Sequence, residues 1–150
     1  MSTDRTINVR FYNEWGADIQ NVILKFSASK SGVESDTYKI DSLEDGGNAG
    51  PFLRHYQTGS GSENFDYWYV EFESLGDPSG KFWCKNNFSC VLDHDVDNTR
   101  EAHFWIGGKK QEAYTGFPED GGGWEGGYSG TPSNDPKSDY TCYVSLDGPA

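Results

Sequence analysis

The feature that most constrains the fold is an alternation of apolar and polar residues with a period of two. In the segment TINVRFYN, Ile7, Val9 and Phe11 would share one face of an extended strand, and the intervening residues would share the other. The segment IQNVILKFS at 19–27 repeats this pattern after the polar turn NEWGAD. These two segments therefore predict a β-hairpin at the start of the chain.

Strand-like segments of the same kind continue to the C-terminus, and no segment has a helical period. Aromatic residues make up 15% of the chain, which favours strands over helices. We therefore expect residues 1–150 to form one all-β domain, an antiparallel β-sandwich of eight or nine strands. The further predicted strands cover residues 36–41, 51–58, 64–72, 81–93 (as a hairpin about Asn86 and Asn87), 100–108 and 139–146.

Two predicted strands carry large side chains on both faces. In NFDYWYVEF, Trp68, Val70 and Phe72 alternate with Tyr67 and Tyr69, which predicts a central strand with one face in the core and the other under a loop. REAHFWIGG places Trp105 on the face opposite its main apolar stripe, where we expect it to help cover the sheet.

The connection at 107–137 is long for a compact domain, and such loops are usually functional or disordered. It contains the glycine-rich stretch GFPEDGGGWEGGYSG, whose aromatic rings have few neighbours in sequence to pack against. Loop aromatics can stack on a sugar or enter a lipid headgroup region, or they can fold back over the sheet. The candidate ligand-binding residues are Trp15, Tyr114, Trp124 and Tyr128.

The segment DHDVDNTRE is a candidate calcium site through Asp93, Asp95 and Asp97. It departs from the EF-hand pattern, because Asn98 replaces the required glycine and Phe104 replaces the bidentate glutamate. The alternative is a solvated acidic turn whose carboxylates bond nearby backbone N–H groups. Calcium is therefore the one cofactor that the sequence suggests.

The net charge of −12 disfavours nucleic acid and anionic lipid as partners. No apolar stretch is long enough to span a bilayer, and no signal peptide is recognisable, so we expect a soluble protein of the cytoplasm or a mature form without its leader. The three histidines lie in no known catalytic motif, which favours a non-enzymatic protein.

The three cysteines match neither a disulfide framework nor a zinc-ligand spacing. We expect small buried side chains at Cys84, Cys90 and Cys142. One bridge, between Cys84 and Cys90 or between Cys90 and Cys142, is the alternative.

The opening INVRFYNEWGADIQNVILKF, together with the small size, acidity and aromatic content, resembles the aegerolysins. These are small β-sandwich proteins that bind membrane lipids and often act with a second, pore-forming component. The resemblance implies recognition of a membrane lipid or its headgroup. It transfers no lipid-binding residue to a position in this chain.

Three functions follow as hypotheses. The first is non-enzymatic binding of a membrane lipid or cell-surface glycan through aromatic residues, as a component of a cytolytic or insecticidal system that can include a second protein. The second is a calcium-binding structural or interaction protein. The third is an enzyme without a recognisable motif.

Overall fold

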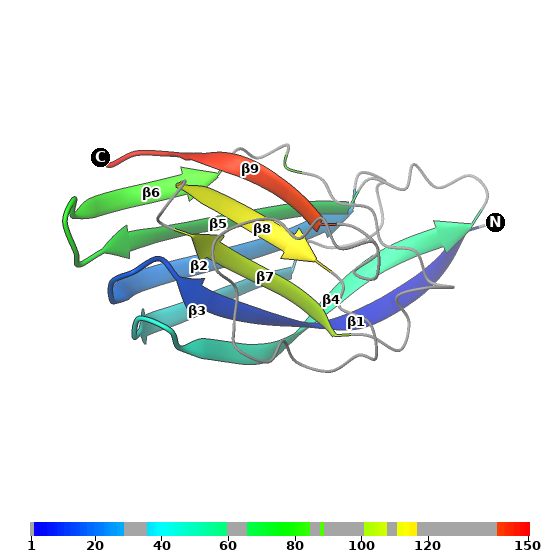
Figure 1. Ribbon diagram of the computed structural model, residues 1–150. Coiled ribbons are helices and arrows are strands. Elements are labelled where there is room, and N and C mark those ends of the chain that lie inside the picture. Colours follow the sequence, from blue (N-terminus) through cyan, green and yellow to red (C-terminus); the bar gives the residue numbers. More distant parts are fainter. Residues whose placement is uncertain are drawn as a thin grey trace.

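The computed structural model describes residues 2–28, 36–59, 66–84, 88, 101–107, 111–116 and 141–150. These residues form nine strands and no helix (Figure 1). The described residues therefore include no helix long and apolar enough to cross a membrane. The strands are β1 (Ser2–Glu14), β2 (Ile19–Ala28), β3 (Asp36–Leu43), β4 (Asn48–Gly59), β5 (Asp66–Ser74), β6 (Gly80–Cys84), β7 (Ala102–Gly107), β8 (Glu112–Gly116) and β9 (Thr141–Asp147).

All nine strands belong to one sheet, in the order β3-β2-β5-β6-β9-β8-β7-β1-β4. The all-β class is confirmed, but a sandwich of two separate sheets is not, because the sheet is continuous, nearly closed and barrel-like. The expectation of purely antiparallel pairing is wrong at one place, where β1 runs parallel to β7. Tight turns impose antiparallel pairing only on strands that are neighbours in sequence, and β1 and β7 are far apart. The predicted hairpin of the first two strands is also wrong, because β1 pairs with β4 and β7 whereas β2 pairs with β3 and β5.

The two outer strands of the sheet, β3 and β4, meet through side chains. The Tyr38 hydroxyl donates a hydrogen bond to the carbonyl oxygen of Leu53. The backbone N–H of His55 donates to Asp36 Oδ2 at 2.7 Å, and the same carboxylate pairs with the His55 ring. These contacts bring the two edges together without a backbone ladder between them.

The core lies between the two halves of the curved sheet. Phe104 of β7 contacts Phe26 of β2 and Trp68 of β5, with ring centroids 6.1 and 5.8 Å apart. Arg54 of β4 also lies inside, where its guanidinium stacks over Trp68 and donates to two backbone carbonyls, those of Ser27 and Tyr67. The prediction of β5 as a central strand is confirmed, since β5 pairs with both β2 and β6.

One strand lies inside the predicted long loop. Strand β8 occupies Glu112–Gly116 within the stretch 107–137, so this part of the loop prediction is wrong. Its five residues are nearly all buried, so a period-two pattern of apolar and polar residues does not mark it. The glycine-rich stretch beyond Gly116 lies outside the described residues.

The cysteines are not all free. Cys142 is in a disulfide, which corrects the expectation of three thiols, whereas Cys84 is free and buried. The pairing of Cys84 with Cys90 is therefore excluded. Burial raises the pKa of the Cys84 thiol to about 12.

Candidate functional site

A β-bulge interrupts the pairing of β1 with β4. Val9 pairs with Phe52 and Phe11 with Ala49, so Arg10 faces two residues of β4, Gly50 and Pro51. Gly50 has a φ of +126°, and a Cβ atom there would lie 2.9 Å from the carbonyl oxygen of Val9. Glycine therefore allows the close approach of β4 to β1 that forms this site.

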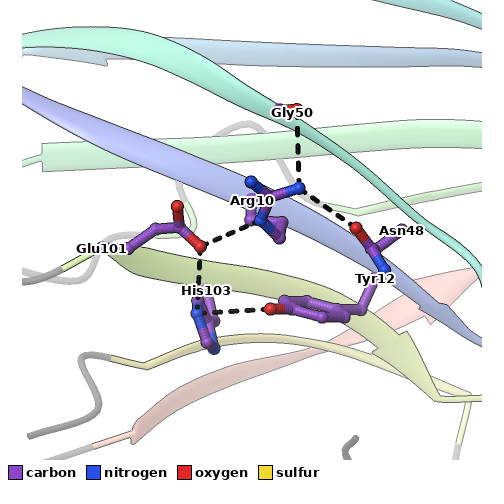
Figure 2. Close-up of polar contacts among 6 residues, drawn as sticks. All are labelled: Arg10, Tyr12, Asn48, Gly50, Glu101 and His103. Atoms are coloured by element: carbon purple, nitrogen blue, oxygen red, sulfur yellow. Dashed lines mark hydrogen bonds and ion pairs between the residues drawn. The ribbon is translucent and has the colours of Figure 1, made fainter. Parts of the chain in front are cut away.

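The guanidinium of Arg10 is held at this bulge by three acceptors (Figure 2). Nε donates to Glu101 Oε1 at 3.0 Å, and Nη1 donates to Asn48 Oδ1 at 3.1 Å. A longer contact of 3.4 Å joins Nη1 to the carbonyl oxygen of Gly50. Glu101 is within reach because the parallel register of β1 and β7 places Arg10 beside His103, two residues after Glu101.

His103 lies beneath this ion pair and is fully buried. Its Nε2 atom is 3.4 Å from Glu101 Oε1 and 3.4 Å from the Tyr12 hydroxyl oxygen (Figure 2). Burial is the larger cause, and the nearby charge of Arg10 the smaller, of a decrease in the pKa of His103 to about 3. The imidazole is therefore neutral at pH 7. Its contact with Glu101 is therefore a long polar contact and not an ion pair.

A row of aromatic residues lies beside this cluster, on the same outward face of the sheet. Tyr12, Trp105, Tyr114 and Tyr143 are paired across β1, β7, β8 and β9. The Trp105 and Tyr114 rings stack with centroids 5.1 Å apart, and both are fully buried. Tyr143, at the end of the row, is 59% exposed. The outward face of β7 and β8 is thus a second buried region.

These placements bear on the predicted ligand-binding residues. Tyr114, expected on a loop, lies in β8, and its buried ring makes it part of the aromatic row rather than a surface contact. Trp15 lies in the β1–β2 turn and is partly exposed. Trp124 and Tyr128 lie outside the described residues, as do Asp93, Asp95 and Asp97.

Trp15 belongs to a group of turns at one end of the sheet (left in Figure 1). Its indole N–H donates to Ser74 Oγ at 3.1 Å, and its ring packs on Phe72 and Phe82. The backbone N–H of Leu75 donates to the carbonyl oxygen of Asp18, which fixes the β5–β6 turn beside the β1–β2 turn. Leu75 is 56% exposed at this end.

The turns are fixed by polar side chains. The Asn13 side-chain amide donates to the carbonyl oxygens of Ala17, Leu43 and Glu44, which joins the β1–β2 turn to the β3–β4 turn. Asp18 and Asp45 accept hydrogen bonds from backbone N–H groups of this region. Their carboxylates therefore support the turns, and no group of three metal-ligating side chains occurs among the described residues.

The cluster around Arg10 was not predicted from the sequence. A signal was present, because Gly50 and Pro51 interrupt a strand-like segment and such residues within strands often mark bulges. Nothing in the sequence indicates that β7 would lie next to β1, since the two strands are separated by most of the chain. The contact of Arg10 with Glu101 depends on that pairing.

The chemistry of this cluster favours binding over proton transfer. The low pKa of His103 makes its imidazole a weak base, and burial raises the pKa of Tyr12, so both groups stay neutral near pH 7. Among the described residues, Arg10 Nη2 and Glu101 Oε2 have no hydrogen-bond partner. One free donor and one free acceptor thus remain on a fixed, partly exposed ion pair.

Comparisons with known proteins give no family for this chain. No protein-family model matches it, and no curated protein shows significant similarity to it. The resemblance to aegerolysins stays a prediction from the sequence.

Proposed function

We propose that this protein is a non-enzymatic binding protein that recognises a membrane lipid or a cell-surface glycan. The observation that carries the lipid proposal is the fixed end of the sheet, where Leu75 is exposed next to the turn that holds Trp15. We call Trp15, Ala17 and Leu75 the turn tip. An exposed apolar side chain beside a tryptophan suits the boundary between headgroups and acyl chains.

Rigidity supports binding at the turn tip. Gly76 approaches Ala17 so closely that a Cβ atom added to it would lie 2.5 Å from the Ala17 Cβ. Together with the hydrogen bonds of Asn13 and Asp18, this contact fixes the position of Leu75 before any ligand arrives. Little conformational entropy would then be lost on binding.

Charge restricts the kind of membrane. Asp18, Asp45 and Asp77 are exposed in the turns at this end, and the whole chain carries a charge of −12. Anionic lipid surfaces would repel this end, whereas zwitterionic headgroups would not. We therefore expect binding to vesicles of phosphatidylcholine and weaker binding when phosphatidylserine is added.

Vesicle sedimentation tests the lipid proposal. Leu75→Ser should weaken binding at least about tenfold, because burying a leucine side chain stabilises by about 1.5–3 kcal/mol. Leu53→Ser is the matched control, since Leu53 is 43% exposed but lies on β4, outside the turn tip. Equal binding by the Leu75→Ser and Leu53→Ser variants would show that the turn tip is not the contact.

The glycan alternative is favoured by a different observation, the free donor and acceptor of Arg10 and Glu101. A glycan array tests this alternative in parallel. Both assays are run with calcium and with chelator, which also tests whether calcium contributes to binding. Absence of binding to every vesicle and every glycan in both conditions would refute the proposed function.

A further inference from the structure

We propose that Arg10 Nη2 and Glu101 Oε2 form a subsite that binds neighbouring hydroxyl groups of a saccharide. The inference rests on the glycan alternative of the proposed function and names its site. Nη2 shares with Nε the edge of the guanidinium that faces Glu101, so the free donor lies on the same side as the carboxylate. One hydroxyl can accept from Nη2 while its neighbour donates to Oε2.

The charges of the pair select a neutral ligand. An anion would be repelled by Glu101, and a cation would be repelled by Arg10. A diol presents a donor and an acceptor side by side without net charge, and its hydrogen bonds to charged groups are stronger than those between neutral partners. A saccharide therefore matches the free atoms of this ion pair.

The surroundings hold the pair in place without a ligand. Asn48 and Gly50 fix Nη1, and buried His103 limits the movement of Glu101 from below. The side chains of Arg10 and Glu101 remain 28% and 20% exposed. The subsite is thus ordered and still accessible to a ligand.

An apolar side chain lies near the subsite. Leu53 is paired directly with Asn8, and both are exposed on the outward face that carries Arg10 two residues further along β1. Leu53 can contact the C–H face of a sugar whose hydroxyls bind the ion pair, and Asn8 adds a donor and an acceptor. Saccharide sites commonly combine apolar contact with a few fixed polar groups in this way.

Another ion pair of the sheet, between Lys81 and Glu71, provides a matched control. Lys81 Nζ lies 2.9 Å from Glu71 Oε2, and the Glu71 side chain is 17% exposed, close to the value for Glu101. Lysine has one terminal nitrogen and therefore cannot offer a second donor beside the carboxylate, as Arg10 does through Nη2. The pair also lies on other strands, β5 and β6. Glu71→Gln should therefore leave saccharide binding unchanged.

The test is a titration followed by ¹H–¹⁵N NMR with glucose, galactose, mannose, fucose and N-acetylglucosamine. We expect at least one sugar to give a saturable shift of the Arg10 Nε–H resonance, with a Kd on the order of 1 mM. Glu101→Gln and Arg10→Lys should each weaken this binding at least tenfold. Arg10→Lys retains a positive charge for Glu101 but lacks Nη2. If the unfolding midpoint of this variant is unchanged, the weaker binding results from the loss of Nη2 and not from loss of folding.

Two results would overturn the inference. One is that none of the five sugars shifts the Arg10 resonance, even if vesicles are bound, in which case the lipid proposal stands alone. Another is saccharide binding that Glu101→Gln does not weaken, which would place the glycan site elsewhere.

Discussion

Strands β5 and β7 follow the same alternation of side chains, yet their outward faces differ. On β5, Tyr69 and Glu71 point outward and remain partly exposed, with Lys25 over the Tyr69 ring and Lys81 paired with Glu71. On β7, every residue is buried, including the outward His103 and Trp105. The outward surface of β5 is thus an ordinary solvated surface, whereas the outward surface of β7 is a second interior.

The difference shows what an apolar stripe can and cannot indicate. The stripe identifies the residues that face the core, because a misaligned strand would expose all of them to water. It does not indicate whether the opposite face is covered, since that depends on contacts with distant segments. Four predictions test this contrast and the bulge beside the buried region, in order of decreasing effect.

The largest effect is expected from truncating an outward tryptophan. Trp105→Ala should lower the free energy of unfolding by about 3–5 kcal/mol, as for a core residue, because the ring is fully buried. Tyr69→Ala, on the solvated outward surface of β5, should cost only roughly 1 kcal/mol. Urea denaturation of both variants gives the comparison, and equal losses would contradict the existence of a second interior.

A smaller effect is expected at the bulge. Gly50→Ala should destabilise by about 2–3 kcal/mol, because alanine is strained at a φ of +126° and its Cβ would crowd the Val9 carbonyl oxygen. Gly46→Ala is the control, since Gly46 also has a positive φ but nothing lies within 4 Å of an added Cβ. If thermal melts show the same loss for both variants, the close approach of β4 to β1 does not matter.

The pH dependence of stability should identify His103. The pKa of His103 in the folded protein, about 3, lies below the ordinary histidine value of 6.5. The stability that the neutral imidazole provides is therefore present above pH 6.5 and is lost as the pH falls below 6.5. The expected loss is about 1.4 kcal/mol per pH unit, or roughly 2 kcal/mol between pH 6.5 and pH 5.

Urea midpoints over this pH range provide the measurement. His103→Gln should remove this slope, whereas His55→Gln, which alters an exposed histidine, should leave it intact. A slope that survives in the His103→Gln variant would show that another group causes it.

Much of the fold could be predicted because its main features are local. Alternation correctly placed Ile7, Val9 and Phe11 in the core. The predicted pairing of the first two strands as a hairpin is wrong, because β1 pairs with β4 and β7 whereas β2 pairs with β3 and β5. Strand β8 was missed because its residues are buried on both faces and so do not alternate. The parallel pairing of β1 with β7 was missed because no short-range signal encodes it, and the Arg10 cluster was missed with it.

The most direct test of the account is a pair of double-mutant cycles on the two ion pairs. For Arg10→Met and Glu101→Gln, we expect a coupling energy of roughly 1–2 kcal/mol, because the pair is partly buried and held by Asn48, Gly50 and His103. For Lys81→Met and Glu71→Gln, we expect about 0.2–0.5 kcal/mol, because the Lys81 side chain is 48% exposed and flexible. Equal coupling energies would contradict the claim that the bulge and the buried face create a preorganised site at Arg10 and Glu101.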